Sequence, residues 1–327
     1  MSLSVVLVGL GPIGVGIGRL LRARSDVALV GAADIDPQKT GRDLGEILEG
    51  PPLGVTVSGS VGAALAARPQ VAVLATGSRL PAIAPQIYEL IEGGCSVVST
   101  SEELSYPWRR HPDLAAEIDR RTRARGVTVV GVGVNPGFAM DLLPIVLTAP
   151  CPSISAVRVE RVVDASARRL PLQRKVGIGM TRDEFERGAA SGTIGHVGLR
   201  ESAEMIAAAV GWDLDGLTET IEPVLDGSAV RGLHQTATAS VSGEVVVTYD
   251  LVMAAGAASK DEIWIAGPLP LHVLVVGGIH GDVATWSIAA SAAVAVREAP
   301  AGLLSPFQLP VVHWRRPAVE AAAAGRT

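Results

Sequence analysis

Lysine, aromatic residues and cysteine are all scarce in this sequence. The three lysines (Lys39, Lys175 and Lys260) leave few candidates for a Schiff-base or proton-donating lysine. The two cysteines, Cys95 and Cys151, are too few for a disulfide framework and are typical of a reducing cytoplasm. The six histidines show no metal-ligand spacing with one another or with cysteine, so we expect no metal site.

A membrane-length apolar run and an excess of basic residues are also missing. Residues 283–296 form the longest apolar candidate and are too short to span a bilayer, and the first residues have no basic region typical of a signal peptide. The net charge of −5, with scattered basic residues, does not indicate nucleic-acid binding. We therefore expect a cytoplasmic protein without a membrane or nucleic-acid partner. The 48% hydrophobic content instead favours a buried parallel sheet and an apolar subunit interface.

The first residues form an apolar strand that leads directly into a glycine-spaced turn. Gly9, Gly11 and Gly14 fit the G-x-G-x-x-G pattern, and Asp34 follows Gly14 by 20 residues, after a second apolar run. The first glycine permits the tight turn, the second lets a pyrophosphate approach, and the third lets the helix pack on the strand. The helix N-terminus then offers N–H groups and a positive dipole end to the phosphates. This order predicts NAD or NADP binding, with turn contacts at Gly9, Gly11, Pro12, Ile13 and Gly14.

The residues after the second strand bear on cofactor preference. Asp34 favours NAD, because a carboxylate accepts hydrogen bonds from the ribose hydroxyls and repels a 2′-phosphate. Asp36 is the alternative ribose ligand if the strand ends two residues later, and Lys39 or Arg42 could bind a 2′-phosphate, which keeps NADP open. Thr76, after another apolar strand, is a small residue that could line the nicotinamide ribose.

Strand and helix patterns alternate over residues 1–137, which is typical of a doubly wound α/β Rossmann domain. Its expected strands are Ser4–Gly9, Val27–Asp34, Val55–Val57, Val71–Thr76, Ser96–Thr100 and Thr128–Val132. Residues 138–314 are predicted to form an α+β substrate-binding and dimerisation domain with an open mixed sheet, entered through a linking helix over 138–148. Its expected strands are Val157–Ala165, Thr236–Val241, Gly243–Ala254, Glu262–Ile265 and Leu271–Gly277. Helix 284–298 is a candidate to pack back on the first domain, and residues 315–327 are expected to be a frayed tail.

The loops that follow the strands of an open α/β sheet are where ligands bind. One such loop holds Glu102, which is the best candidate for a general acid/base. Nearby Tyr106, Trp108 and Phe138 would partly desolvate this carboxyl and raise its pKa toward the working range. The next loop supplies Asn135, an amide for the cofactor or the substrate.

A capping role is the competing interpretation of these glutamates. Ser99-x-x-Glu102 and Thr100-x-x-Glu103 both match a helix capping box, in which the glutamate only binds backbone N–H groups. One glutamate could therefore be a cap while the other faces the substrate.

Two groups in the second domain have both a functional and a structural interpretation. His196 lies in a glycine-rich segment that opens a helix, where it either points into the cleft or is solvated on a flexible connection. Asp164 follows a strand near Arg161, Arg168 and Arg169, so it either joins surface ion pairs or meets a cationic substrate.

With these residues in view, the chain resembles the 2,4-diaminopentanoate dehydrogenases and the related native amine dehydrogenases, within the wider dihydrodipicolinate-reductase-like group. The resemblance covers most of the chain and rests on residues 9–14, 101–108, 133–138, 195–202 and 281–285. The stretch Ser-Glu-Glu-Leu-Ser-Tyr-Pro-Trp at 101–108 is its specific part. The His-His-x-x-Lys motif of the group's reductases is absent, which argues against dihydrodipicolinate reduction.

The resemblance implies a homodimer that uses NAD or NADP for the reversible oxidative deamination of a small amine or diamine, or the reductive amination of a ketone with ammonia. It also implies a catalytic carboxylate in the glutamate motif, which we assign to Glu102 with Glu103 as reserve. The candidate substrate pocket comprises Tyr106, Trp108, Asn135, Phe138, Asp164 and His196. The candidate cofactor site comprises the turn residues above together with Asp34, Lys39, Thr76 and Asn135. Two alternatives stay open: a carbonyl or imine reductase that does not use free ammonia, and a non-catalytic NAD(P)-binding sensor.

Overall fold

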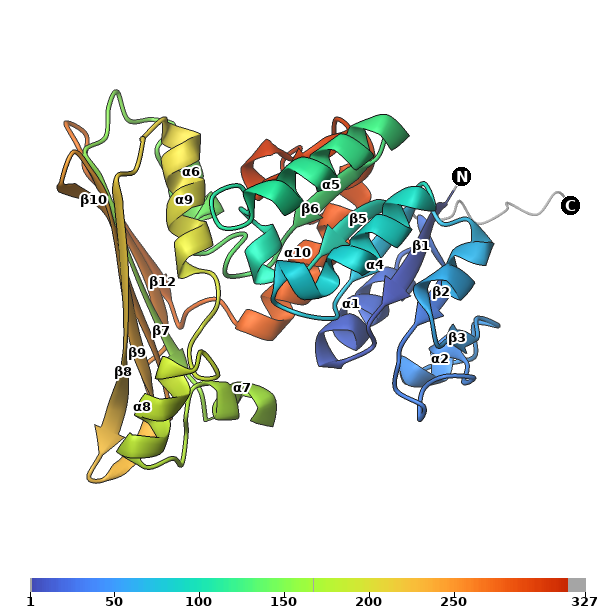
Figure 1. Cartoon of the computed structure of the whole chain (residues 1–327), viewed down its shortest axis with the longest axis horizontal. Helices are drawn as coiled ribbons and strands as arrows, with labels where there is room; N and C mark the ends of the chain where they lie inside the picture. The colour runs from blue at the N-terminus through green and yellow to red at the C-terminus, as the bar shows by residue number, and fades with distance from the viewer. Residues whose placement is uncertain (1, 167, 317–327) are drawn as a thin grey trace, which may run out of the picture. The chain divides into compact units, whose positions relative to one another are not determined.

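A computed structural model describes residues 2–166 and 168–316 and divides the chain into two units (Figure 1). Of the described residues, unit 1 holds those from 2 to 133 and from 281 to 316, and unit 2 holds those between Val134 and His280. The sequence placed residues 281–314 with the second domain and gave helix 284–298 as a candidate to pack on the first; in the structure, residues 281–314 belong to unit 1. Of the predicted tail, residues 317–327 lie outside the described residues.

Unit 1 is a seven-stranded parallel sheet flanked by helices, which confirms the predicted doubly wound fold. In sheet order its strands are β13 (Gly302–Leu304), β6 (Thr128–Gly131), β5 (Ser96–Ser99), β4 (Val71–Leu74), β1 (Leu3–Val8), β2 (Val27–Ala33) and β3 (Val57–Ser58). Its α-helices are α1 (Pro12–Arg22), α2 (Leu44–Ile47), α3 (Val61–Ala64), α4 (Leu80–Glu92), α5 (Pro112–Arg125) and α10 (Gly281–Ala295). Short 3₁₀ turns are η1 (Leu65–Ala67), η2 (Glu102–Leu104), η3 (Val296–Glu298) and η4 (Pro306–Gln308).

Both faces of this sheet are buried, which is why its strands are continuous apolar runs. In β1, Val5 and Leu7 belong to the hydrophobic core on one face, while Val6 and Val8 belong to the core on the other. The first core contains α1 and α10, and the second contains α4 and α5. The period of two along the strand thus divides its side chains between two layers of helices.

Helix α10 belongs to unit 1 because its small side chains pack close to α1. Ala289, Ala292 and Ala293 are fully buried in the core that also holds Ile17 of α1. A Cβ on Gly16 of α1 would overlap the ring of Trp286, so the glycine allows this close approach. After α10 the chain adds β13 beside β6 at the sheet edge.

Unit 2 is a six-stranded mixed sheet with helices on one side (Figure 1). In sheet order its strands are β12 (Leu271–Val276), β11 (Lys260–Ala266), β7 (Ala156–Asp164), β10 (Glu244–Ala254), β9 (Ala229–Val241) and β8 (Gly216–Asp226). The one parallel pair is β7 with β10, and its other neighbouring strands are antiparallel. Its helices are α6 (Leu142–Leu147), α7 (Leu170–Lys175), α8 (Arg182–Ala190) and α9 (Leu199–Val210).

Strand β8 and the first half of β9 were missed by the sequence analysis. Edge strand β8 carries Glu219, Glu222 and Pro223, which have low strand propensity, and most of its side chains are at least partly exposed. The predicted linking helix over 138–148 is also shorter in the structure, because Asp141 caps α6 by accepting a hydrogen bond from the Leu142 N–H. Across the described residues, we find no helix with the length and apolarity needed to cross a membrane.

Candidate active site

The glycine turn between β1 and α1 contains two glycines that the fold requires and one that faces open space. Gly9 has φ of +87°, and a Cβ there would lie 2.6 Å from the carbonyl oxygen of Ala75. A Cβ on Gly14 would overlap the carbonyl oxygen of Gly9. At Gly11, which precedes the first residue of α1, a Cβ would meet no described atom within 4 Å. This cradle fits a dinucleotide, whose pyrophosphate would approach Gly11 and the first N–H groups of the helix.

Asp34 lies at the end of β2 and connects the glycine turn to the loop that follows. Its Oδ2 accepts a hydrogen bond from the Leu10 N–H at 2.6 Å, and its Oδ1 accepts one from the Asp36 N–H at 2.8 Å. The Lys39 Nζ lies 3.4 Å from Asp34 Oδ2 and 3.2 Å from Asp36 Oδ2. Since each carboxylate oxygen can accept two hydrogen bonds, Asp34 keeps acceptor capacity for a ribose hydroxyl.

Thr76, after β4, lies next to the glycine turn. Its Cγ2 would be 2.8 Å from a Cβ on Gly9, and its hydroxyl donates a hydrogen bond to Gln86 Oε1 at 2.5 Å. The side chain is exposed. Because β4 is the neighbour of β1 in the parallel sheet, this loop and the glycine turn lie at the same carboxyl edge.

The adjacent glutamates of η2, which follows β5, have different surroundings. The Glu103 side chain is only 2% exposed, and its Oε1 accepts a hydrogen bond from Arg79 Nη1 at 2.8 Å. Its Oε2 accepts one from the Leu80 N–H at 2.9 Å and lies 2.8 Å from His111 Nε2. Burial raises the pKa of Glu103, but the hydrogen bonds from Arg79, Leu80 and His111 outweigh burial and hold that pKa below its usual value. Both oxygens of the Glu103 carboxylate are thus bound to protein groups, which favours Glu102 over the reserve residue as the carboxylate that meets the substrate.

Glu102 is partly exposed, between the buried residues Ser101 and Glu103. The residue that precedes η2 is Ser101, and its side chain does not cap the turn. Ser99 instead donates its hydroxyl to the carbonyl oxygen of Leu74 and accepts a hydrogen bond from the Ser101 N–H. The Glu103 side chain accepts its backbone hydrogen bond from Leu80, at the start of α4, and not from its own turn. The predicted capping box Thr100-x-x-Glu103 therefore does not describe the contacts of Glu103.

The aromatic residues predicted beside Glu102 are partly buried. The rings of Tyr106 and Trp108 pack at a centroid distance of 4.9 Å, tilted by 55°. Both belong to unit 1, whereas Phe138 is a partly buried residue of unit 2.

The candidate residues of unit 2 include an amide–imidazole pair, of which Asn135 is buried and His196 is partly buried. Asn135 Nδ2 lies 3.1 Å from His196 Nε2 and 2.9 Å from Met140 Sδ. The side-chain amide oxygen of Asn135, Oδ1, is buried and has no hydrogen-bond partner among the described residues. Burial lowers the pKa of His196 to about 3, and the charges of Lys175 and Arg161 add to this effect. The imidazole is therefore neutral near pH 7 and accepts from the Asn135 amide, which leaves the amide oxygen for a ligand N–H.

Gln235 holds the His196 backbone and was missed by the sequence analysis. Its Oε1 accepts a hydrogen bond from the His196 N–H at 2.8 Å, and its Nε2 donates to the His196 carbonyl oxygen at 2.9 Å. Gln235 is fully buried on β9, on the same inward face as Leu233 and Ala237. A glutamine at an inward position of an alternating strand is the signal that could have identified it.

The loop that carries Asn135 is supported by a second buried carboxyl. Asp141 accepts hydrogen bonds from the Gly137 N–H at 2.9 Å and from the Ser202 hydroxyl at 2.7 Å. Burial raises the pKa of Asp141, against the effect of these hydrogen bonds. Gly198 completes the contact, because a Cβ at that position would overlap the ring of Pro136. The Asn-Pro-Gly turn and the glycine-rich segment around His196 are thus packed together.

Asp164 and Arg161 have separate roles in the structure. Asp164 Oδ1 accepts hydrogen bonds from the Ser166 N–H and hydroxyl and from the Gly256 N–H, so this carboxylate ties the loop after β7 to the loop after β10. Arg161 is buried and forms an ion pair with Asp261, and both side chains hydrogen bond to the backbone of Ile279. Arg161 is therefore one member of a buried ion pair, and it does not take part in a network of ion pairs on the protein surface.

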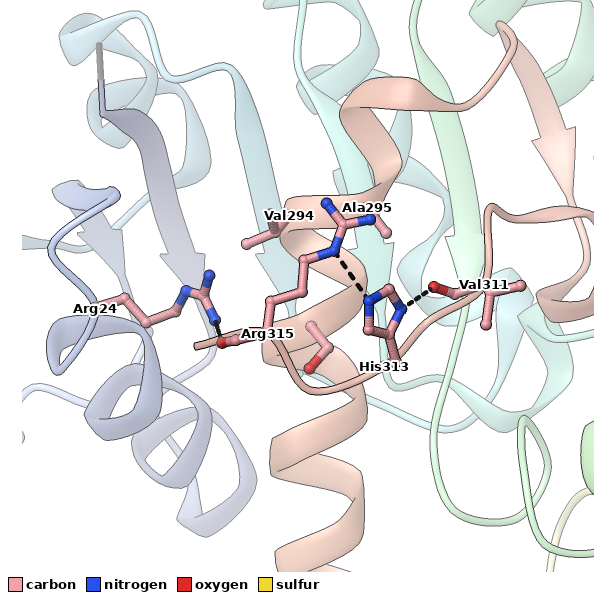
Figure 2. Close-up of a pocket in the computed structure, with 7 residues that line it drawn as sticks. Arg24, Val294, Ala295, Val311, His313 and Arg315 are labelled. Atoms are coloured by element: carbon pink, nitrogen blue, oxygen red, sulfur yellow. Dashed lines mark hydrogen bonds between the residues drawn. The ribbon is translucent and has the colours of Figure 1, made fainter. Parts of the chain in front are cut away.

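A small pocket in unit 1 is not a substrate site. It is lined by Arg24, Ser291, Val294, Ala295, Val311, His313 and Arg315, most of which Figure 2 shows. Its volume of about 10 Å³ is enough for roughly one water molecule. Arg24 precedes β2, which places the pocket at the amino edge of the sheet, opposite the ligand-binding edge. Among the described residues, no group of three or more His, Cys, Asp or Glu side chains is arranged to hold a metal.

Solved structures with the same fold include several dehydrogenases. An amine dehydrogenase from Mycobacterium smegmatis matches with a TM-score of 0.86 and 24% identity, over 96% of this chain and 98% of that one. A scyllo-inositol dehydrogenase from Lactobacillus casei, with bound NAD(H), matches with a TM-score of 0.60 and 13% identity, over 94% of each chain. At these identities the matches show the fold.

Sequence comparisons identify the family. A family model for the 2,4-diaminopentanoate dehydrogenase C-terminal domain matches residues 138–323. The chain is 34% identical to a 2,4-diaminopentanoate dehydrogenase from Acetoanaerobium sticklandii, over 68% of this chain and 65% of that protein. It is 30% identical to an amine dehydrogenase from Streptomyces virginiae, over 74% of this chain and 67% of that protein. The matched segment thus spans about two thirds of each relative. The chain belongs to the 2,4-diaminopentanoate dehydrogenase family.

Proposed function

We propose that this protein is an NAD(P)-dependent amine dehydrogenase, which interconverts a small amine or diamine with the corresponding ketone and ammonia. The observation that carries the proposal is the arrangement of three loops at the carboxyl edge of one parallel sheet. The glycine turn follows β1, Thr76 follows β4, and Glu102 follows β5, and these strands are neighbours in that order. A dinucleotide site and a partly exposed carboxylate therefore share one edge, in a chain whose relatives are named as dehydrogenases of amines.

The cofactor, when bound, exchanges a hydride with the substrate carbon. The protein supplies proton transfer and charge. In the direction of amination, the Glu102 carboxylate takes a proton from ammonium, so that ammonia can attack the carbonyl carbon. The protonated carboxyl then gives its proton to the leaving hydroxyl, which departs as water, and the carboxylate stabilises the positive iminium that remains. In deamination the carboxylate accepts the proton of the substrate ammonium and releases it to solvent. As a carboxylate again, it takes a proton from the water that attacks the iminium carbon, and it gives that proton to the departing ammonia.

Asn135 is proposed to orient an N–H donor. Its buried carbonyl oxygen loses the hydrogen bonds that water would give, and an N–H group of the substrate or of the nicotinamide amide would restore one. His196 holds the amide of Asn135, and because it is neutral it is not the general acid near pH 7. These properties support Glu102 as the group that moves the proton.

The surroundings of Asp164 bear on the substrate class. A diamine would place a second ammonium in the pocket, and Asp164 was the predicted contact for it. The Oδ1 of that carboxylate already accepts two hydrogen bonds from Ser166 and one from Gly256, in the loop after β10. This engagement favours a monoamine over a diamine that uses Asp164.

The function is tested with purified protein, NADH or NADPH, and a panel of short ketones with and without ammonium. We expect cofactor oxidation that depends on ammonium, and a loss of kcat of at least ~10² in Glu102→Gln with unchanged NADH affinity. Glu117→Gln is the matched control, since Glu117 is a carboxylate of the same unit that pairs with Arg120 and Arg121 on α5. Oxidation without ammonium would indicate the carbonyl or imine reductase, and binding without turnover the sensor. A fully active Glu102→Gln would exclude Glu102 as the acid/base.

We also propose a cytoplasmic homodimer. Two unpaired cysteines support a reducing compartment. The helix-free face of the unit 2 sheet carries charges of both signs, since Lys260 lies 2.8 Å from Glu160 and 2.7 Å from Glu262. Such a face can be complementary to the same face of a second copy, which supports a homodimer. At the edge of this face, Leu274 and Val276 are exposed apolar residues. Light scattering should give twice the chain mass, and Val276→Glu should shift it toward the monomer.

A further inference from the structure

The buried glutamate of η2 connects two loops at the ligand-binding edge of unit 1. We propose that Glu103 is a positioning residue that holds the backbone of Glu102 in place by tying η2 to the loop between β4 and α4. This inference rests on the proposed role of Glu102. In this proposal the second glutamate of the motif has a structural role and takes no part in proton transfer.

The contacts between the two loops involve both side chain and backbone. The Glu103 carboxylate binds Arg79 Nη1 and the Leu80 N–H, and its own N–H donates to the Ser78 carbonyl oxygen at 3.2 Å. The Ser101 hydroxyl donates to that same oxygen at 2.9 Å. Residues on both sides of Glu102 are therefore held against the loop that follows Thr76.

The sequence of α4 explains why this anchor is needed. Leu80 is the first residue of α4, and its backbone N–H has no partner within the helix. The residue before it is Arg79, whose guanidinium has no acceptor and cannot cap the helix. The carboxylate of Glu103 supplies the missing acceptor and places a negative charge at the positive end of the helix.

His111 and Arg110 complete the surroundings of Glu103 from the other side. His111 Nε2 lies 2.8 Å from Glu103 Oε2, and Arg110 Nε lies 3.7 Å from Oε1. A carboxylate that is buried and paired in this way is costly to disturb, because removing the partners of a buried charge leaves it unpaired. Glu102 is the next residue along the backbone, so the point from which its side chain starts can shift only if these contacts break. A displacement of about 1 Å at a reacting group can lower a rate ~10²-fold.

The test is Glu103→Gln, alone and combined with Glu102→Gln. The amide keeps the size of the side chain and an acceptor for the Leu80 N–H, but loses the charge that pairs with Arg79. We expect kcat for reductive amination to fall at least ~10-fold, while the ketone KM and the NADH Kd stay within about twofold of wild type. Because Glu103 acts through Glu102, adding Glu103→Gln to Glu102→Gln should cause no further loss. Glu117→Gln is again the control and should leave kcat unchanged.

Hydrogen exchange tests the same proposal without cofactor or substrate. Hydrogen exchange at the amides of residues 101–106 should be faster in Glu103→Gln than in wild type, and unchanged in Glu117→Gln. If Glu103→Gln does not fold, Arg79→Gln removes one partner only, and we expect the same changes on a smaller scale.

Four results would overturn the inference. Glu103→Gln could keep the wild-type kcat and the wild-type hydrogen exchange, or it could lower kcat equally in the wild type and in Glu102→Gln. It could also change only the ketone KM, or it could weaken NADH binding. Retained activity in Glu102→Gln would instead exclude Glu102 as the acid/base, and cofactor oxidation without ammonium would contradict the proposed function, so these failures are distinguishable from a failure of the Glu103 proposal.

Discussion

Replacing Gly11 by alanine adds one methyl group to the glycine turn where the fold leaves room for it. A Cβ at Gly11 meets no described atom within 4 Å, and the backbone angles (φ −67°, ψ −179°) are available to any residue. Alanine is less favourable than glycine at this helix N-cap by about 0.5–1 kcal/mol. Its lower entropy in the unfolded chain offsets this by about 0.4–1 kcal/mol. We therefore expect the free energy of unfolding to change by less than about 0.5 kcal/mol.

The same methyl group should block the bound cofactor. If the pyrophosphate approaches the backbone at Gly11, a side chain there pushes it away from the N–H groups of α1. A hydrogen bond to a charged group contributes about 1.5–3 kcal/mol, so the loss of one raises the NADH Kd about 10- to 150-fold.

Gly14→Ala is the matched comparison, because its methyl group would overlap the Gly9 carbonyl oxygen. Overpacking costs about 1–3 kcal/mol, and the better helix propensity of alanine returns at most about 1 kcal/mol. We expect this variant to lower the free energy of unfolding even without cofactor, whereas Gly11→Ala should not.

Urea unfolding of the cofactor-free proteins and fluorescence titration with NADH measure the two effects separately. A Gly11→Ala protein that binds NADH with the wild-type Kd would refute the approach of the pyrophosphate at this residue. A Gly14→Ala protein of wild-type stability would refute the close contact between the turn and α1.

Three further predictions concern single side chains. Asp34→Asn should weaken NADH binding at least ~10-fold by removing the ribose acceptor and reduce discrimination against NADPH; unchanged affinity for both cofactors in titrations would move the ribose contact to Asp36. Arg161→Met should lower the free energy of unfolding by about 3–5 kcal/mol, since the Asp261 carboxylate is then buried without its cation; a loss below ~1 kcal/mol in urea would show that the pair is dispensable. The pKa of His196 is about 3 in the folded protein and about 6.5 when unfolded, so the folded state binds fewer protons and stability falls as the pH drops below about 6.5. From pH 7 to pH 5 the wild type should lose about 1–2 kcal/mol more than His196→Gln in urea unfolding, and equal losses would contradict a buried neutral imidazole.

The parts of the fold that depend on local pattern were predictable from the sequence. The apolar run of β1, the glycine spacing and Asp34 all lie within 34 residues, and the structure places them as strand, turn, helix and strand end. The family also follows from such local stretches, and the comparisons confirm it. Strand β8 was missed because its side chains are polar and its pairing with β9 supplies the stability that local propensity lacks.

The roles of individual polar residues depended on tertiary contacts. Glu102 and Glu103 are equivalent in the sequence motif, and only the packing of η2 against Arg79, Leu80 and His111 makes Glu103 the buried one. The assignment of Glu102 and the pocket residues to catalysis remains a prediction.

The sequence by itself determined the alternation of strands and helices in the first domain, the nucleotide-binding turn and the family, because backbone propensity and residue spacing act between near neighbours along the chain. Only the tertiary structure decided that Asn135 meets His196, 61 residues away, and that Gln235 holds the His196 backbone. The burial and pairing of a side chain depend on groups that folding brings together from distant positions, and no local pattern records them.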